Sequence, residues 1–520
     1  MHVDVENGKQ SLWLRHIPTG SNTQVVPPID EQYKGLTFSN DGNYFYFVRT
    51  DKNHPGVSEL YRAPVLGGEP RLLIADVDSP VSFSPDGTRL VFERFNPHRG
   101  EFHLIIANSD GGEEKVLATR KLPEGFLGIP AWSPDGKVVA ATGFTEGGGE
   151  SIETIDVATG AVKIVTARER SSTDVGNVGA LRWMPDVRGV LIAHQTLAHQ
   201  QTYQISHLTY PSGELSRITN DLNSYDAVAL SVTADGKTLA TVEEERTFGL
   251  WVMPAGENGT AKARQIGMGK NEGSAVEWTP DERLLTSLGF DDYVRNADGS
   301  GKNMVYSSNQ PSFAPAVCGH SLIVPILEFG KGMNLFRVDL NGGAKNQITF
   351  GRFNWNPACS PDGQWIVYES EDESRKRVHK ISVEGGAPQK LSELTATRPT
   401  FSPDGKLVAF VYSEGESVEK FHLKIAVIPA EGGNPLYTFM AGLPRRIQFT
   451  PDGKGLAWPI NEGGVGNIWV QPLAGGPPKQ LTSFASEMVE DFAFSHNGKS
   501  MALLRGHVAK DVVLIKETGR

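Results

Sequence analysis

Several features that mark other protein classes are scarce in this sequence. Its 520 residues include two cysteines, Cys318 and Cys359, too few for a disulfide framework or a zinc site and silent about the redox compartment. The formal net charge is −11, from 50 basic and 61 acidic residues, whereas a nucleic-acid-binding protein needs a basic surface. No run approaches the ~18 apolar residues of a membrane span, and the polar segment Met1–Asn7 lacks the pattern of a signal peptide. The composition therefore predicts neither a nucleic-acid partner nor a membrane span.

The motifs of common catalytic classes are also missing. A kinase needs a phosphate-covering glycine loop, a strand lysine and a His-Arg-Asp triplet, and the sequence has none of these. The nucleophile elbow Gly-x-Ser-x-Gly begins at Gly319 but ends on Ile323, and the phosphate-loop ending at Gly498 has Ala493 where a glycine is required. Acidic pairs such as Asp291-Asp292 supply too few oxygen ligands for calcium. We therefore expect no catalytic residue, no metal site and no cofactor.

Glycine is what the chain has in excess, with 57 of 520 residues, about 11% against a usual ~7%. Much of it lies in a repeated hairpin, Ser-Pro-Asp-Gly or Thr-Pro-Asp-Gly, at 84–87, 133–136, 360–363, 402–405 and 450–453. Five looser copies, at 39–42, 184–186, 233–236, 279–281 and 495–498, and a degenerate one near Cys318–His320 bring the total to eleven. Their spacing of about 40–50 residues is the period of propeller blades.

The chemistry of the repeat explains the hairpin. Proline presets φ for the first turn position, aspartate bonds its own backbone two residues on, and glycine takes the left-handed conformation. Short apolar runs such as 407–410 flank the turns, as expected of strands covered on both faces. A second turn, usually Gly-Gly, follows each hairpin, as at 67–68 and 475–476. Each repeat therefore predicts four antiparallel strands, which is one blade.

The repeat count predicts an all-β chain made of two β-propellers. Eleven hairpins and an initial half-blade, Leu12–Val26, give about twelve four-stranded blades, more than one ring holds. Six plus six blades is the simplest division, with propellers at 1–268 and 269–520, and seven plus five stays open. The last unit stops after a third strand, Asp511–Lys516. Either the two ends pair to close a ring, or the chain is part of a longer protein.

The Ser-Pro-Asp-Gly-Lys hairpins with Gly-Gly outer turns resemble the WD-like repeats of TolB-type β-propellers. Whole phrases, such as those at 7–15, 79–87 and 475–482, further resemble the C-terminal propeller region of acidobacterial membrane-anchored serine/threonine kinases. In that family the kinase and the anchor precede the propeller, and this sequence contains neither. The resemblance implies a sensor or scaffold module, extracytoplasmic if it is attached to such a kinase; the sequence itself assigns no location.

Exposed rim loops are the remaining candidates for function, because binding residues on a rigid scaffold lie on its loops. Aromatic and arginine side chains are typical interface anchors, and they occur before three predicted innermost strands: Tyr225, Arg352, Phe353, Trp355, Arg445 and Arg446. Packing of Phe353 and Trp355 between blades is the alternative. We expect a non-catalytic module that binds a protein or a small molecule. A TolB-like envelope scaffold and an enzyme with its site at a channel mouth are the other hypotheses.

Overall fold

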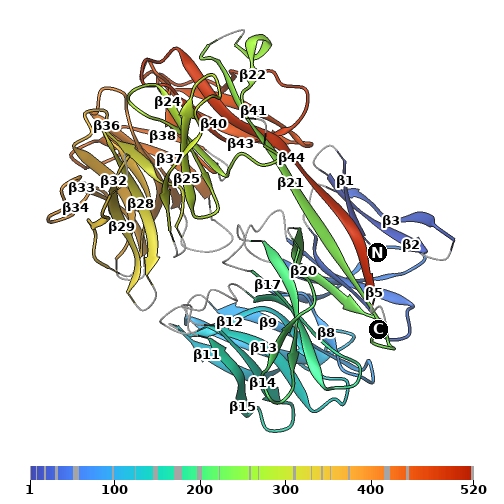
Figure 1. Ribbon diagram of the computed structural model, residues 1–520. Coiled ribbons are helices and arrows are strands. Elements are labelled where there is room, and N and C mark those ends of the chain that lie inside the picture. The colour runs from blue at the N-terminus through green and yellow to red at the C-terminus, as the bar shows by residue number, and fades with distance from the viewer. Residues whose placement is uncertain are drawn as a thin grey trace. The chain divides into compact units, whose positions relative to one another are not determined.

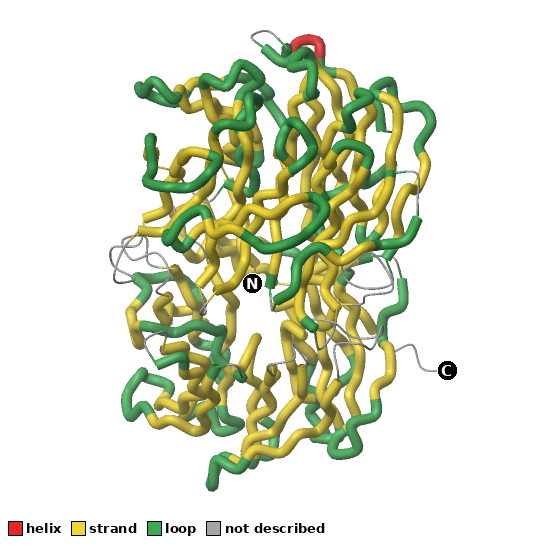
Figure 2. The backbone as a smooth tube through the Cα atoms, turned by 90° about the vertical axis from the view of Figure 1, so that its left-hand side faces the viewer, coloured by secondary structure: helices red, strands yellow, loops and turns green. Residues whose placement is uncertain are grey.

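The computed structural model describes most of the chain. The described residues are 2–6, 9–16, 19–29, 33–50, 58–96, 99–122, 124–144, 150–168, 178–195, 202–221, 223–256, 259–267, 269–308, 312–328, 331–340, 343–351, 353–372, 375–414, 422–440 and 444–516. Almost all regular structure in them is strand, and Figure 2 shows one short helix in that part of the chain, the 3-10 turn Thr260–Lys262. The predicted all-β class is confirmed.

Contacts divide the chain into two compact units, Met1–Glu245 with Ala509–Arg520, and Arg246–Val508. The chain leaves the first unit within β21 (Thr238–Pro254) and returns to it within β44 (Ser500–Lys516), two strands of 17 residues each (Figure 1). The predicted division lay at 268/269 and kept Asp511–Lys516 with the second part. The contact grouping differs because it follows strand pairing rather than sequence order, and the limits of the two propeller rings stay a prediction.

The first unit consists of antiparallel sets of strands in chain order, two of which are joined into one eight-stranded sheet by a parallel pairing of Ile129 with Ala180. Their strands are β1 (His2–Glu6), β2 (Lys9–His16) and β3 (Ser21–Ile29); β4 (Tyr33–Phe38), β5 (Tyr44–Thr50), β6 (Ser58–Pro64) and β7 (Arg71–Ala75); β8 (Ser82–Phe83), β9 (Arg89–Asn96), β10 (Glu101–Asn108) and β11 (Lys115–Lys121); β12 (Gly125–Trp132), β13 (Val138–Phe144), β14 (Glu150–Asp156) and β15 (Val162–Arg168); β16 (Val178–Trp183), β17 (Gly189–Gln195), β18 (Tyr203–Thr209) and β19 (Leu215–Arg217); and β20 (Ser224–Val232) with β21 and β44.

The second unit contains five four-stranded sheets in chain order and a sixth built from both of its ends. Their strands are β23 (Ala275–Trp278), β24 (Arg283–Leu288), β25 (Asp291–Asn296) and β26 (Asn303–Ser307); β27 (Ala316–Cys318), β28 (Ser321–Glu328), β29 (Gly332–Asp339) and β30 (Asn346–Gln347); β31 (Asn354–Cys359), β32 (Trp365–Asp372), β33 (Arg375–Ser382) and β34 (Gln389–Lys390); β35 (Ala396–Phe401), β36 (Leu407–Glu414), β37 (His422–Pro429) and β38 (Tyr437–Met440); β39 (Gln448–Phe449), β40 (Gly455–Glu462), β41 (Val465–Pro472) and β42 (Lys479–Gln480); and β43 (Met488–Phe494) with β44, β21 and β22 (Arg264–Gln265).

The sixth sheet closes the second unit into a ring. Its innermost strand, β43, lies beside β23 of the first sheet: the Trp278 indole N–H donates to the carbonyl of Ala493 over 3.0 Å, and the Val276 amide donates to Asp491 over 2.8 Å. Sheets packed in succession and closed in this way confirm the predicted propeller fold. The number of blades stays a prediction, because the first sheet has three strands, β12 to β19 form one eight-stranded sheet, and β20 belongs to the same five-stranded sheet as β43.

The hairpin turns have the predicted chemistry. In the copy at 84–87, the Ser84 hydroxyl donates to Asp86 over 2.5 Å and accepts the Arg89 amide over 3.0 Å, while Asp86 accepts the Thr88 amide over 3.0 Å. Gly87 has φ = 72°, in the left-handed region. The hydrogen bonds from Ser84 and Thr88 lower the pKa of Asp86 to about 2. The repeated aspartate therefore serves the turn and is not available as a catalytic acid.

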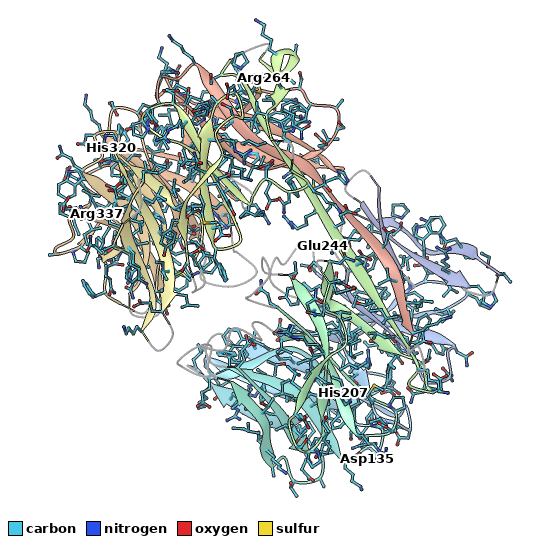
Figure 3. All side chains as sticks on the ribbon, viewed as in Figure 1. Asp135, His207, Glu244, Arg264, His320 and Arg337 are labelled. Atoms are coloured by element: carbon cyan, nitrogen blue, oxygen red, sulfur yellow. A yellow bond between two sulfur atoms is a disulfide. The ribbon has the colours of Figure 1, made fainter. Side chains whose placement is uncertain are left out.

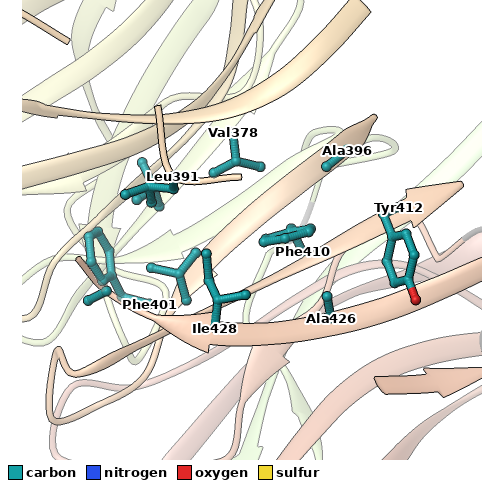
Figure 4. Close-up of a cluster of buried hydrophobic side chains, with 11 residues drawn as sticks. Val378, Leu391, Ala396, Phe401, Phe410, Tyr412, Ala426 and Ile428 are labelled. Atoms are coloured by element: carbon teal, nitrogen blue, oxygen red, sulfur yellow. The ribbon is translucent and has the colours of Figure 1, made fainter. Parts of the chain in front are cut away.

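Apolar side chains fill the space between neighbouring sheets. Figure 4 shows such a cluster, in which Val378 of one sheet packs against Phe410 and Ile428 of the next. Each of these side chains is buried, which stabilises the fold by roughly 1.5–3 kcal/mol per large side chain. The apolar runs beside each hairpin supply these contacts, as the sequence predicts.

A disulfide joins Cys318 at the end of β27 to Cys359 at the end of β31, with their Cα atoms 5.4 Å apart. The two cysteines are separated by 41 residues, yet adjacent sheets place their innermost strands side by side. The sequence analysis did not foresee this cross-link, because the pairing depends on which strands are neighbours and not on local sequence.

Candidate functional site

The innermost strands of the second unit all begin at the same end of the ring, since its sheets share one strand order. We call this end the mouth; it is formed by the starts of β23, β27, β31, β35, β39 and β43 and the residues just before them. Loops and strand ends of a rigid scaffold are where binding side chains are placed. The mouth gathers most of the residues that the sequence analysis selected.

Two innermost strands at the mouth contain β-bulges with strained backbone. The pairing register shifts between Trp355 and Ala358 in β31 and between Thr397 and Thr400 in β35. Within these bulges Asn356 has φ = 46° and Arg398 has φ = 55°, in the left-handed region. Such a conformation costs about 1–3 kcal/mol for a residue other than glycine, so the surrounding structure must hold it.

Glu369 on β32 provides that restraint. Its side chain is 2% exposed, and its carboxylate accepts the backbone N–H of Arg398 over 2.8 Å. The same oxygen accepts hydrogen bonds from the Asn356 side-chain amide and the Thr397 hydroxyl. One buried carboxylate therefore fixes both bulges and links two neighbouring sheets.

Arg446, just before β39, connects two further strands at the mouth, β23 and β43. Its guanidinium donates to the Val276 carbonyl over 2.8 Å and to Asp491 over 3.1 Å, and it forms an ion pair with Glu277. Burial opposes the charge of this side chain, but the carboxylates of Glu277 and Asp491 outweigh that effect and raise the pKa of Arg446 above its ordinary value. Arg446 is therefore a permanently charged structural centre of the mouth.

Arg445 turns toward solvent from the same segment. It pairs with Glu490 on β43, which also pairs with Arg246 on β21 over 3.1 Å. The Arg445 side chain is 62% exposed and that of Glu490 only 11%. Burial of part of the group and the positive charges of Arg246 and Arg398 lower the pKa of Arg445. Arg398 at the start of β35 and Arg445 just before β39 belong to neighbouring innermost strands.

Arg398 has a different environment from these two. No hydrogen bond or ion pair of its guanidinium is found within the described part of the chain, although its backbone N–H binds Glu369. Burial lowers the pKa of Arg398, and the charge of Glu369 partly offsets this. The mouth therefore contains a half-buried cation whose charged end has no fixed partner among the described residues.

Three aromatic rings form a cluster at the starts of two neighbouring sheets. The rings of Phe313 and Trp355 have centroids 4.8 Å apart, and those of Phe353 and Trp355 are 5.3 Å apart. Phe313 precedes β27 while the other two belong to the start of the β31 sheet, so the cluster joins two sheets. The Lys376 ammonium lies 4.8 Å from the centre of the Phe353 ring. All three rings are half-buried and retain accessible surface.

The structure places four of the six predicted residues at the mouth, in two separate pairs. Arg445 and Arg446 belong to the charged cluster, and Phe353 and Trp355 to the aromatic one, where they also make the packing contacts that the alternative hypothesis expected. Arg352 lies outside the described residues. Tyr225 belongs to the first unit, where it is buried and its hydroxyl donates to Asp221 over 2.8 Å. Its environment is that of a core residue.

The sequence analysis missed Asn356, Arg398 and Asp491, although the repeat contained a signal for them. Together with Arg446, each stands six residues before the hairpin Asp or Asn of its repeat. The first sheet of the second unit has Ala275 there, and the first unit has only small or apolar residues at this place: Gly35, Pro80, Ile129, Ala180 and Ala229. Aligning the repeats on the hairpin would have singled out the mouth of the second unit.

Other kinds of site find little support. Across the described ranges, no group of three or more His, Cys, Asp or Glu side chains is placed to hold a metal ion. The predicted acidic pair is split, because Asp292 is buried against Ser287 while Asp291 accepts a hydrogen bond from Ser307. No helix in the described part of the chain is long and apolar enough to cross a membrane.

Comparison with known proteins gives partial likenesses. No family model matches the sequence. An uncharacterized protein of Agrobacterium fabrum is 23% identical over 135 residues, which are 24% of this chain and 46% of that protein. Dipeptidyl-peptidase 5 of Porphyromonas gingivalis is 27% identical over 146 residues, 25% of this chain and 20% of that protein. The chain thus spans less than half the length of these curated relatives. Among solved structures, TolB from Acinetobacter baumannii is similar with a TM-score of 0.30 and 15% identity, covering 74% of this chain and 80% of that one.

Proposed function

We propose that this chain is a non-catalytic β-propeller module that binds a protein or small-molecule ligand at the mouth of its second unit. The observation that carries the proposal is the contrast between the two units at one repeat position. The second unit places Asn356, Arg398, Arg446 and Asp491 where the first unit has glycine, proline or aliphatic residues. Two of these residues, Asn356 and Arg398, have strained backbone, and strain of this kind is concentrated at functional sites.

A binding role fits the mouth better than an acid–base role. A channel-mouth enzyme requires a charged cluster there, and the cluster exists. General acid–base catalysis also requires a group that is free to exchange a proton with the substrate. The carboxylates of Glu277 and Asp491 are committed to Arg446, Glu490 to two arginines, and Glu369 to three donors. These acids support the arginines instead of exchanging protons.

The cellular setting of the proposal is the sensor or scaffold part of a receptor-type bacterial serine/threonine kinase. This assignment rests on the resemblance of sequence phrases, and a TolB-like envelope scaffold remains the alternative. The disulfide between Cys318 and Cys359 supports an extracytoplasmic location in either case, because disulfides persist mainly in oxidising compartments.

A ligand screen on the full chain tests the proposal. Thermal-shift measurements with a panel of metabolites and short peptides should yield a ligand that stabilises the wild-type protein and has no such effect on Arg398→Gln. The ligand should be recovered unchanged after prolonged incubation, as judged by NMR. Turnover of the ligand would make the chain an enzyme. Stabilisation that is insensitive to every mouth variant would place the binding surface elsewhere.

A further inference from the structure

We infer that the mouth of the second unit recognises an organic carboxylate, with its anionic group between Arg398 and Arg445 and its apolar body on Phe313, Phe353 and Trp355. This inference rests on the binding function proposed above and names its ligand class. It is argued from three features: an arginine without a fixed partner, the arrangement of charge by depth, and the position of the aromatic rings.

The first feature is Arg398 itself. In the bulge its backbone has φ = 55°. The buried carboxylate of Glu369 accepts the Arg398 backbone N–H and so holds that conformation. A strained position of this kind persists only when the surrounding structure over-determines it. The bulge re-aims a side chain at the strand start, and within the described residues that side chain's charged end binds nothing.

The second feature is that acids and bases lie at different depths. The carboxylates of Glu369, Asp491 and Glu490 are 2%, 9% and 11% exposed. Arg445 and Arg246, which both pair with Glu490, are 62% and 37% exposed. Around Glu490 the exposed charged ends are therefore those of the two arginines, although the whole chain carries a formal charge of −11.

An anion would relieve the repulsion within this surface. The charge of Arg398 disfavours that of Arg445, as does the charge of Arg246. A carboxylate between Arg398 and Arg445 would neutralise both charges. It could accept two parallel N–H···O hydrogen bonds from either guanidinium group. The Arg445 side chain is 62% exposed, so a ligand in solution can reach it.

The third feature separates an organic carboxylate from a simple anion. Trp355 is followed by Asn356, whose side chain binds the same Glu369 carboxylate that holds the backbone of Arg398. One carboxylate thus holds the two neighbouring bulges from which the Trp355 and Arg398 side chains extend. Half-buried rings next to a cation suit a ligand with an apolar body attached to its anionic group; inorganic phosphate offers only the anionic half.

Isothermal titration calorimetry with a matched pair of probes tests the inference. The probes are 3-phenylpropionate and its uncharged analogue 3-phenylpropionamide, with inorganic phosphate as a third arm, each titrated into the full chain at low ionic strength. We expect the carboxylate to bind at least tenfold more tightly than the amide or phosphate. Arg398→Gln and Arg445→Gln should each weaken the carboxylate at least tenfold, and Trp355→Ala should weaken it without producing a preference for the amide.

Arg337→Gln is the matched control, because Arg337 lies on β29 of the same unit (Figure 3) and pairs with Glu384 away from the mouth. It should change affinity less than twofold. Arg398→Lys keeps the positive charge but lacks the planar guanidinium, so it should bind 3-phenylpropionate with intermediate affinity. The thermal unfolding transition of each variant reports whether it is folded. Equal binding of acid and amide, equal binding of phosphate, equal loss in the control, or no binding to wild type would each overturn the inference. An uncharged ligand from the wider screen that depends on the mouth would leave the proposed function standing and refute this carboxylate class alone.

Discussion

Glu93 and Glu369 occupy equivalent positions, each seven residues after its hairpin aspartate, but their environments differ. Glu369 is held by three donors, whereas the Glu93 carboxyl has no hydrogen-bond donor among the described residues and lies near Asp78. Burial, followed by the charge of Asp78, raises the pKa of Glu93 from 4.5 to about 8. The same carboxyl thus serves as a bulge anchor in one unit and a destabilising group in the other.

The raised pKa of Glu93 makes stability depend on pH. The folded state holds its proton up to about pH 8, whereas the unfolded chain releases it near 4.5, so this contribution to stability is complete below pH 4.5 and is lost as the pH rises toward 8. The loss by pH 7 is about 3 kcal/mol. We expect Glu93→Gln to raise the Tm at pH 8 and to flatten its dependence between pH 5 and 8. Glu114→Gln, at an exposed ion pair of the same unit, should leave the slope unchanged; an equal slope for wild type and Glu93→Gln would contradict the prediction.

The adjacent arginines at the mouth should differ sharply in their effect on folding. Arg446→Ala leaves Glu277 and Asp491 without their shared cation, and breaking a largely buried pair of this kind costs about 3–5 kcal/mol. Arg445→Ala removes an exposed side chain and should cost less than about 1 kcal/mol. Urea denaturation followed by tryptophan fluorescence measures both. Similar losses for the two variants would show that Arg446 is not the structural centre of the mouth.

At the scale of strands and sheets, the disulfide fixes two neighbours at one end while the aromatic cluster joins the same two sheets at the other. Replacing Cys318 and Cys359 by serine removes a cross-link over 41 residues, and the chain-entropy effect predicts a loss of about 3–4 kcal/mol. Unfolding of the double variant by urea should shift to match that of wild type measured with a reductant. If reductant shifts the wild type but the double variant is as stable as oxidised wild type, the stabilisation has another origin.

What the sequence predicted at this scale was what local chemistry determines. Ser84, Asp86 and Gly87 specify a turn by themselves, so the hairpins, the strand runs and the all-β class followed from the repeats. Other features depend on which strands become neighbours, and no single repeat contains that information. These are the Cys318–Cys359 disulfide, the hydrogen bonds that Glu369 accepts from two bulges, and the role of Arg398. The predicted rim residues at the mouth could still be found, because aromatic and arginine side chains before an innermost strand are visible in one repeat.

At the scale of the whole molecule, β21 and β44 each contribute residues to both units. The segment Ala509–Arg520 belongs with the first unit by its contacts, although it follows the second unit in sequence. Lys510 pairs with Asp226 and Glu244, both over 3.1 Å. Burial would lower the pKa of Lys510, but these two carboxylates raise it above its ordinary value, so the ammonium stays charged at neutral pH. The first unit is therefore completed by residues that follow the second unit in sequence.

Alternating side chains of β44 provide a matched test of this arrangement. Val513 and Ile515 pack against the buried cluster around Tyr225, whereas Val512 and Leu514 are 58% and 47% exposed. Aspartate at an inward position buries a charge against apolar groups and should cost several kcal/mol, while aspartate at an outward position should be tolerated. We expect Ile515→Asp to accelerate amide hydrogen exchange in β20 of the first unit and to leave β31 of the second unchanged, with Leu514→Asp resembling wild type. Faster exchange in β31 alone would assign this strand segment to the second unit, and equal effects of the two variants would show that it has no buried face.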